Sequence, residues 1–69
     1  MKPLVYWCRW HEAKLKLQGR SATAVWGYLE FGDGRHEPFQ FDLQNWRLTL
    51  NPDSDARTIQ LDEMGVEVV

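Results

Sequence analysis

The chain has 69 residues, a formal net charge of −2 and a single cysteine. This length allows one small domain over residues 1–69 and leaves no room for a second. One cysteine excludes an internal disulfide, and the sequence contains neither a signal-peptide pattern nor a run of roughly 18 apolar residues that could span a membrane. We therefore expect a soluble, cytoplasmic protein that makes no contact with a membrane.

Charge is distributed unevenly along the chain. Residues 1–21 carry five basic side chains and one acidic side chain, whereas residues 22–69 carry three arginines and nine acidic residues. The first segment therefore has a balance of +4 and the second a balance of −6. These charges either form an ordinary solvated surface or give a basic edge on an acidic body, and the second arrangement would steer the protein toward a charged partner.

The segment VYWCRWH, residues 5–11, is dense in aromatic side chains. We interpret it, together with Leu4, as a strand with two different faces. The face directed into the core would consist of Leu4, Tyr6, Cys8 and Trp10. The exposed face would consist of Val5, Trp7, Arg9 and His11.

The next segment, HEAKLKLQG at residues 11–19, fits two structures. It contains good helix formers and ends at Gly19, which is typical of a residue just beyond a helix. It also contains Lys-Leu-Lys-Leu, which alternates as a strand does. We favour a long, bulged strand, and a short helix near residues 11–18 is the alternative.

Residues 22–31, ATAVWGYLEF, are apolar on both faces, which predicts an inner strand covered on both sides. Gly27 in its middle indicates a sharp bend or a close approach of another backbone segment. The following GDGR, residues 32–35, predicts a hairpin turn, because glycine adopts positive φ without strain.

Three alternating segments follow: HEPFQFDL at 36–43, WRLTL at 46–50 and RTIQL at 57–61. Gln44 and Asn45 would form a two-residue hairpin loop between the first two, and NPDSDA at 51–56 predicts a loop before the third. MGVEVV at 64–69 predicts a last strand with Met64, Val66 and Val68 aligned. The core would contain Phe39, Phe41, Leu43, Trp46, Leu48, Leu50, Ile59 and Leu61.

These short strands, with a glycine inside one of them, predict a mainly β fold. The expected architecture is a small, strongly bent antiparallel barrel of five to six strands, of the Sm-like or SH3-like type.

The last 24 residues resemble the C-terminal half of a WYL domain, an Sm-like barrel found in bacterial regulators. Trp46 and Leu48 match the family's Trp-x-Leu strand, and Asp53 and Asp55 match its Asp-rich turn. The matches in the two closing strands are Arg57, Thr58, Leu61, Asp62, Val66 and Val68. The segment LEFGDGRHEP also resembles the family's preceding hairpin, so the resemblance covers about 40 of the 69 residues.

The resemblance implies the barrel fold and binding of nucleic acid or a nucleotide ligand. At the position of the family's tyrosine this chain has Arg47. Gln60 and Glu63 stand where the family usually has basic residues.

The motifs of metal sites and active sites are incomplete in this sequence. Cys8 and His11 have the spacing of half a zinc site, but the only further histidine is His36 and there is no second cysteine. Neither a Gly-x-Ser-x-Gly motif nor a phosphate-binding glycine loop occurs. We therefore expect a protein that is not an enzyme and that uses no metal and no cofactor.

The function that we favour is protein binding by a module that regulates or inhibits a larger partner. Small acidic domains of this kind occur among inhibitors made by phages and mobile elements. The candidate partner-binding residues are Trp7, Arg9, His11, Lys14, Lys16 and Arg20, because tryptophan and arginine are enriched at binding hot spots. The alternative is a nucleic-acid- or nucleotide-binding regulatory module of the WYL or Sm-like type, and assembly into a homo-oligomer is a further alternative.

Overall fold

The structure, a computed structural model, describes residues 1–68, which form one helix followed by five strands. The helix α1 spans Lys2–Trp10, and the strands are β1 (Ala13–Arg20), β2 (Ala24–Phe31), β3 (His36–Asp42), β4 (Arg47–Leu50) and β5 (Arg57–Gln60). Each strand pairs antiparallel with the next, so that the sheet has the order β1-β2-β3-β4-β5. The prediction of a mainly β, antiparallel fold is confirmed.

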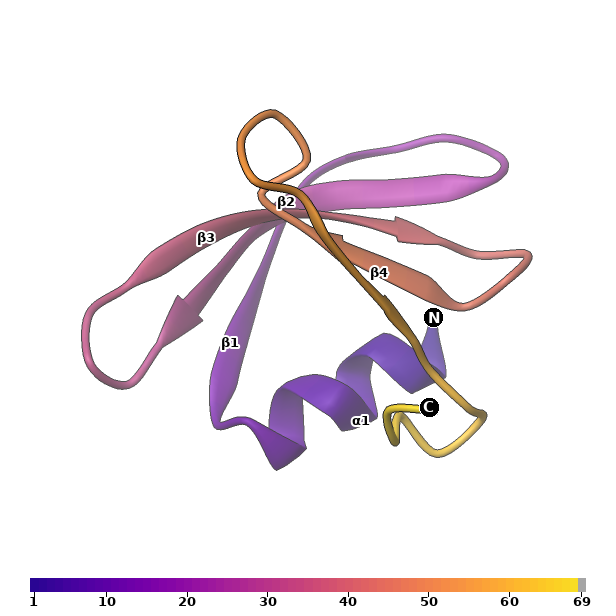
Figure 1. The fold of residues 1–69 in the computed structure, drawn as a ribbon, viewed down its shortest axis with the longest axis horizontal. Helices are drawn as coiled ribbons and strands as arrows, with labels where there is room; N and C mark the ends of the chain where they lie inside the picture. Colours follow the sequence, from indigo (N-terminus) through magenta and orange to yellow (C-terminus); the bar gives the residue numbers. More distant parts are fainter. Residues whose placement is uncertain (69) are drawn as a thin grey trace.

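The sheet is bent, and α1 lies below it in the space between β1 and the segment that follows β5 (Figure 1). Among the described strands no ladder joins β1 to β5. The sheet is therefore open between these two strands, and the closure into a barrel that the sequence predicts is not confirmed.

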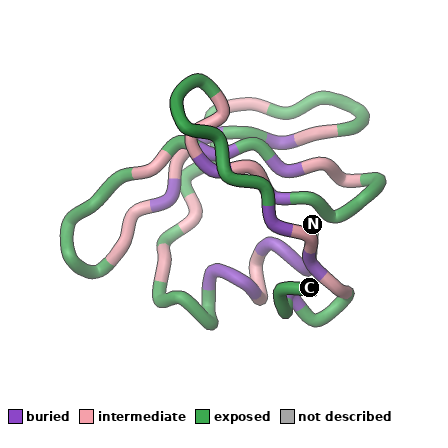
Figure 2. The backbone as a smooth tube through the Cα atoms, viewed as in Figure 1, coloured by how far each residue is buried: buried purple, intermediate pink, exposed green. Residues whose placement is uncertain are grey.

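The hydrophobic core lies between the sheet and α1, while the hairpin loops are exposed (Figure 2). Its buried residues are Leu4, Trp7, Cys8, Val25, Leu29, Phe39, Phe41, Leu48, Leu50, Ile59 and Leu61. Six of the eight predicted core residues belong to this set. Leu43 is half-buried against the core, whereas Trp46 is 38% exposed, so its placement in the core was wrong.

Residues 2–10 form a helix, and the prediction of a strand for this segment was wrong. Pro3 lies in the first turn, where proline is tolerated because the missing N–H group would have no partner inside the helix. The buried side chains of Leu4, Trp7 and Cys8 follow the i, i+3, i+4 spacing of one helical face. Leu4 and Cys8 fit both periods, and this overlap explains the error.

The strand interpretation of the following segment is confirmed by β1, and the alternative of a helix there is excluded. The register of β1 against β2 shifts between Leu17 and Gly19, which is the predicted bulge. A side chain at Gly27 would collide with the carbonyl oxygen of Lys16, so Gly27 marks a close approach of two backbone segments, as predicted.

β2 is covered on one face, not on both as the sequence predicts. Val25 and Leu29 point into the core and are buried, whereas Trp26 on the other face is exposed. Apolar residues on the outer face of β2 therefore meet solvent and the side chains of neighbouring strands.

The loop between β3 and β4 has four residues, 43–46, and not the two that we predicted. Asp42 organises this loop: its Oδ1 accepts hydrogen bonds from the backbone N–H groups of Gln44 at 2.8 Å and Asn45 at 3.1 Å. Its Oδ2 accepts a further bond from Asn45 Nδ2 at 3.1 Å. These hydrogen bonds hold the pKa of the Asp42 carboxyl below its usual value, the bond from the Asn45 side chain having the largest effect and the backbone bonds the next largest.

Trp46 adopts a positive φ of 53° in this loop and turns away from the core.

The predicted last strand is a turn with a single bridge between Leu61 and Glu67. Oδ1 of Asp62 accepts hydrogen bonds from the backbone N–H groups of Met64 at 2.8 Å and Val66 at 3.0 Å, which folds the chain back on itself. Met64, Val66 and Val68 are exposed, and Val69 lies outside the described residues.

Candidate functional site

The structure separates the six predicted partner-binding residues. Trp7 is only 3% exposed and belongs to the core, whereas Arg9 and His11 are exposed at the end of α1. Lys14, Lys16 and Arg20 are exposed on β1. Residues two apart on a helix point about 200° away from each other, so Trp7 and Arg9 do not share a face. The assignment of Trp7 to an exposed binding face was wrong.

Trp10 is the exposed tryptophan of this segment, with 73% of its surface accessible. We predicted both Trp10 and Tyr6 on the core face, and neither is buried. On the outer side of α1 they lie near the turn that follows β5. We name the surface formed by Tyr6, Trp10, Met64 and Val66 the helix–loop patch.

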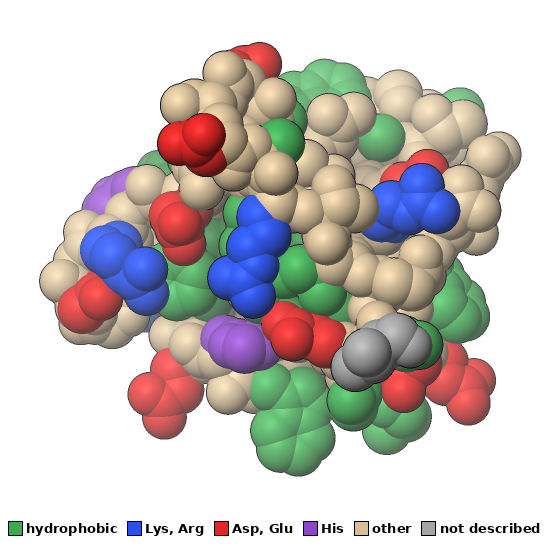
Figure 3. All heavy atoms as spheres, viewed as in Figure 1, with side chains coloured by type: hydrophobic (Ala, Val, Ile, Leu, Met, Phe, Trp, Pro, Cys, Tyr) green, Lys and Arg blue, Asp and Glu red, His purple; other side chains and the backbone are tan. Residues whose placement is uncertain are grey.

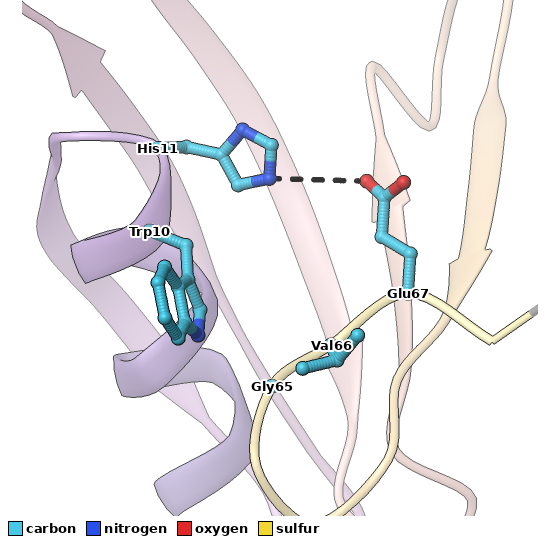
Figure 4. A pocket seen from close by; sticks show the side chains of 5 residues that line it. All are labelled: Trp10, His11, Gly65, Val66 and Glu67. Atoms are coloured by element: carbon cyan, nitrogen blue, oxygen red, sulfur yellow. Dashed lines mark ion pairs between the residues drawn. The ribbon is translucent and has the colours of Figure 1, made fainter.

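Two hollows adjoin Trp10 within the helix–loop patch. One has a volume of about 350 Å³ and is lined by Tyr6, Arg9, Trp10 and Met64. The other has a volume of about 400 Å³ and is lined by Trp10, His11, Gly65, Val66 and Glu67, as Figure 4 shows. In Figure 3, hydrophobic side chains gather along the lower edge of the molecule, over the region of α1 and the C-terminal loop. Trp10 therefore stands on an accessible surface between two hollows, each lined by both apolar and ionisable side chains.

Contacts with α1 hold the turn of the helix–loop patch in place. Gly65 has a φ of +75°, and a side chain there would lie 2.6 Å from the backbone of Pro3 and Trp7, so the turn packs directly on the helix. Glu67 Oε1 accepts a hydrogen bond from Trp7 Nε1 at 3.3 Å and lies 3.9 Å from His11 Nε2 (Figure 4). The rings of Trp7 and His11 are 4.1 Å apart between centroids. Trp7 and His11 therefore contact Glu67, which directly follows Val66 of the patch in the chain.

Lys14 and Lys16 form a separate surface on the outer face of β1, whereas Arg20 pairs with Val25 and therefore lies on the core-facing side of the sheet. Lys14 lies opposite Glu30 and Lys16 opposite Tyr28 on β2, while Arg20 lies at the end of the strand beyond the bulge. Within residues 1–68, none of these three basic side chains comes close enough to a carboxylate to form an ion pair. These cations are therefore available to solvent or to a partner.

The half zinc site considered for Cys8 and His11 has no further ligands in the described structure. Residues 1–68 contain no group of three or more His, Cys, Asp or Glu side chains placed to hold a metal ion. Cys8 is buried and His11 is exposed, so the two side chains lie in different environments.

Cys8 should react slowly as long as the protein is folded. Burial raises the pKa of its thiol to about 11, so the reactive thiolate is scarce at neutral pH. We expect slow labelling by a thiol reagent at pH 7.5, and rapid labelling once denaturant is added. Fast labelling of the folded protein would show that α1 does not bury this side chain as described. Because the pKa is raised, the stability contributed by the buried thiol is present below its ordinary pKa of 9.0 and decreases as pH rises toward 11.

In comparisons with known proteins, no family model, no curated protein and no solved structure matches the chain. The resemblance to WYL domains therefore stays an expectation from the sequence. No helix within residues 1–68 is long and apolar enough to cross a membrane.

The sequence reasoning missed the helix–loop patch because it assigned Trp10, Met64 and Val66 to strands. One signal for it was present. On a helix whose buried face carries Leu4, Trp7 and Cys8, the Trp10 side chain points about 200° away from Cys8. The helical period thus predicts an exposed Trp10.

Proposed function

We propose that this protein is a non-enzymatic protein-binding module that regulates a larger partner through the helix–loop patch. The observation that supports it is the 73% exposure of Trp10 between two hollows lined by apolar and ionisable side chains. Tryptophan and arginine dominate binding hot spots, and Arg9 lines the hollow next to Trp10. A partner that covers Trp10 would explain why so small a domain exposes so large an apolar side chain.

The chemistry of the helix–loop patch indicates what such a partner presents. Met64 has a flexible, polarisable side chain that adapts to different apolar surfaces. Arg9 supplies a planar cation at the rim, which matches a carboxylate. The partner would therefore insert an apolar side chain beside Trp10 and place an acidic group against Arg9. Inhibition of a larger machine, as by proteins of phages or mobile elements, is the form of regulation that we favour.

Substitution of Trp10 tests this proposal. After capture of a partner from the native host in the presence of nuclease, its affinity is measured with purified proteins by titration calorimetry. We expect Trp10→Ala to weaken binding by about 2 kcal/mol or more, the threshold of a hot spot. Trp26→Ala is the matched control, because Trp26 is also exposed but lies on β2. Equal effects of the two substitutions, or none from Trp10→Ala, would contradict the proposed surface.

A second candidate function is binding of nucleic acid or a nucleotide by a WYL-like or Sm-like module. The three exposed cations of β1 favour it, since small β-barrels of this type bind nucleic acids. In that case the slope of log affinity against log salt is steep, and Lys16→Ala reduces it by about one unit. A shallow slope with affinity concentrated in Trp10 favours protein binding instead. We favour protein binding, because the chain carries a net charge of −2 and residues beyond the basic segment are mostly acidic.

A further inference from the structure

β1 is a long strand with one side left unpaired. Seven of its eight residues pair with β2, Gln18 being left out at the bulge, and β2 is its only partner in the described sheet. Within residues 1–68, no hydrogen bond joins β1 to any other element. A free edge of this kind is a template for another extended segment, which would use the unpaired backbone groups.

The opposite edge of the sheet is shorter and is covered at its end. β5 has only four residues, and the backbone N–H of Val68 donates a hydrogen bond to the carbonyl oxygen of Gln60 at 2.8 Å. The bridge between Leu61 and Glu67 continues this cover just beyond β5. The two edges therefore differ, and β1 is the one that offers room for an added strand.

The exposed part of β1 is not covered by α1. Ala13 and Leu15 are partly buried against the core, but Lys16, Leu17 and Gln18 are three consecutive exposed residues. Lys16 and Leu17 are consecutive residues of a strand and point to opposite faces, so neither face is covered at this point. Leu17, which lies on the face opposite the lysines, is 48% exposed.

The charges of β1 indicate which kind of strand can pair with it. Lys14 and Lys16 lie on one face of the strand, with Leu15 and Leu17 on the other. Like charges opposite each other destabilise a strand pair, and lysines on edge strands oppose pairing between copies. A second copy would present the same lysines from β1 or Arg57 from β5. The charge complement of β1 is an acidic segment.

We propose that β1 accepts an extended acidic segment of another protein by strand addition. Its acidic residues alternate with apolar ones, so that carboxylates face Lys14 and Lys16 while apolar side chains lie beside Leu15 and Leu17. The bulge after Leu17 limits the added strand to about five or six residues, since regular pairing ends there. This surface is distinct from the helix–loop patch and does not depend on the function proposed for it.

The test uses a capped synthetic peptide, Glu-Val-Glu-Val-Glu-Val, titrated to about 1 mM into the isotopically labelled protein. Amide chemical shifts identify the surface, and the expected changes are confined to β1 and its neighbours on β2. Replacing the glutamates of the peptide by lysines should weaken binding at least about tenfold. In a second peptide, alternate peptide nitrogens on the edge that faces β1 are methylated. This change should abolish binding, because strand addition depends on backbone hydrogen bonds.

Variants of the protein complete the test. The double variant Lys14→Glu, Lys16→Glu should prefer the lysine peptide, which reverses the selectivity through complementary charges. Arg57→Glu on β5 is the charge control, and Trp10→Ala is the control for the helix–loop patch. Neither should change the affinity for the acidic peptide. The amide spectrum of each variant shows that it is folded.

Several results would overturn strand addition at β1. These are the absence of shift changes at about 1 mM peptide, equal binding of the N-methylated peptide, and shifts confined to α1. Stronger binding of a thymidine oligonucleotide at the same β1 amides would assign the edge to nucleic acid instead.

Discussion

Replacing Trp7 with alanine is expected to lower the free energy of unfolding by about 3–5 kcal/mol. Trp7 is only 3% exposed and joins α1 to the core of the sheet. Its indole N–H also donates the 3.3 Å hydrogen bond to Glu67 that anchors the C-terminal turn. A domain of this size has a total stability of only a few kcal/mol, so the variant should be largely unfolded at 25 °C.

Chemical denaturation followed by circular dichroism measures this effect. The matched controls are Trp10→Ala and Trp46→Ala, because these side chains are 73% and 38% exposed. We expect each control to change the free energy of unfolding by less than about 1 kcal/mol. A stable Trp7→Ala protein together with an unfolded Trp10→Ala protein would mean that the buried face of α1 is centred on Trp10 and not on Trp7.

Strand alternation predicted β3, β4 and β5 well. In β3 and β4 the buried side chains alternate with more exposed ones, because one face of an antiparallel sheet packs on the core, and Ile59 is the buried residue of β5. Phe39 and Phe41 are fully enclosed as this pattern requires. Close approach at Gly27 was also predictable, since a glycine inside a strand leaves space for another backbone segment.

The start of the chain could not be assigned by alternation alone. Leu4 and Cys8 are four residues apart, and this spacing fits both one side of a strand and one side of a helix. The two periods differ in which tryptophan they bury: the strand period places Trp10 on the side of Leu4 and Cys8, whereas in the helix Trp7 is buried with them and Trp10 is exposed. The strand interpretation therefore placed Trp10 in the core and Trp7 on the surface, the reverse of the structure. For the same reason it centred the candidate binding site on Trp7 and not on Trp10.

The C-terminal turn was missed for a different reason. Met64, Val66 and Val68 alternate as in a strand, but the pattern does not reveal that the Asp62 side chain competes for backbone N–H groups. In the structure Asp62 accepts bonds from Met64 and Val66, which closes a turn in place of a ladder. Local side-chain bonds of this kind override alternation when the segment is short. Alternation placed Lys14 and Lys16 on one face of β1 correctly, but the bulge after Leu17 turns Arg20 to the other face.

Gly27→Ala is expected to destabilise the protein by about 3 kcal/mol. A Cβ atom at this position would collide with the carbonyl oxygen of Lys16 and lie 3.0 Å from both the Leu17 Cα and the Gln18 backbone nitrogen. These are backbone atoms of the paired strand, so no side-chain rotation relieves the overlap. The strand β1 would have to move away from β2, which breaks ladder hydrogen bonds near the bulge.

Gly32→Ala is the matched control for Gly27→Ala, because a Cβ atom at Gly32 would have no heavy atom within 4 Å. We expect this control to leave the denaturation midpoint nearly unchanged, since a glycine in an open turn accepts a methyl group without a clash. Amide hydrogen exchange adds a local measurement. In Gly27→Ala, protection should be lost first along Lys16, Leu17 and the facing part of β2, and later in β3 and β4. Equal stability of the two variants would mean that β1 does not pass as close to Gly27 as the structure describes.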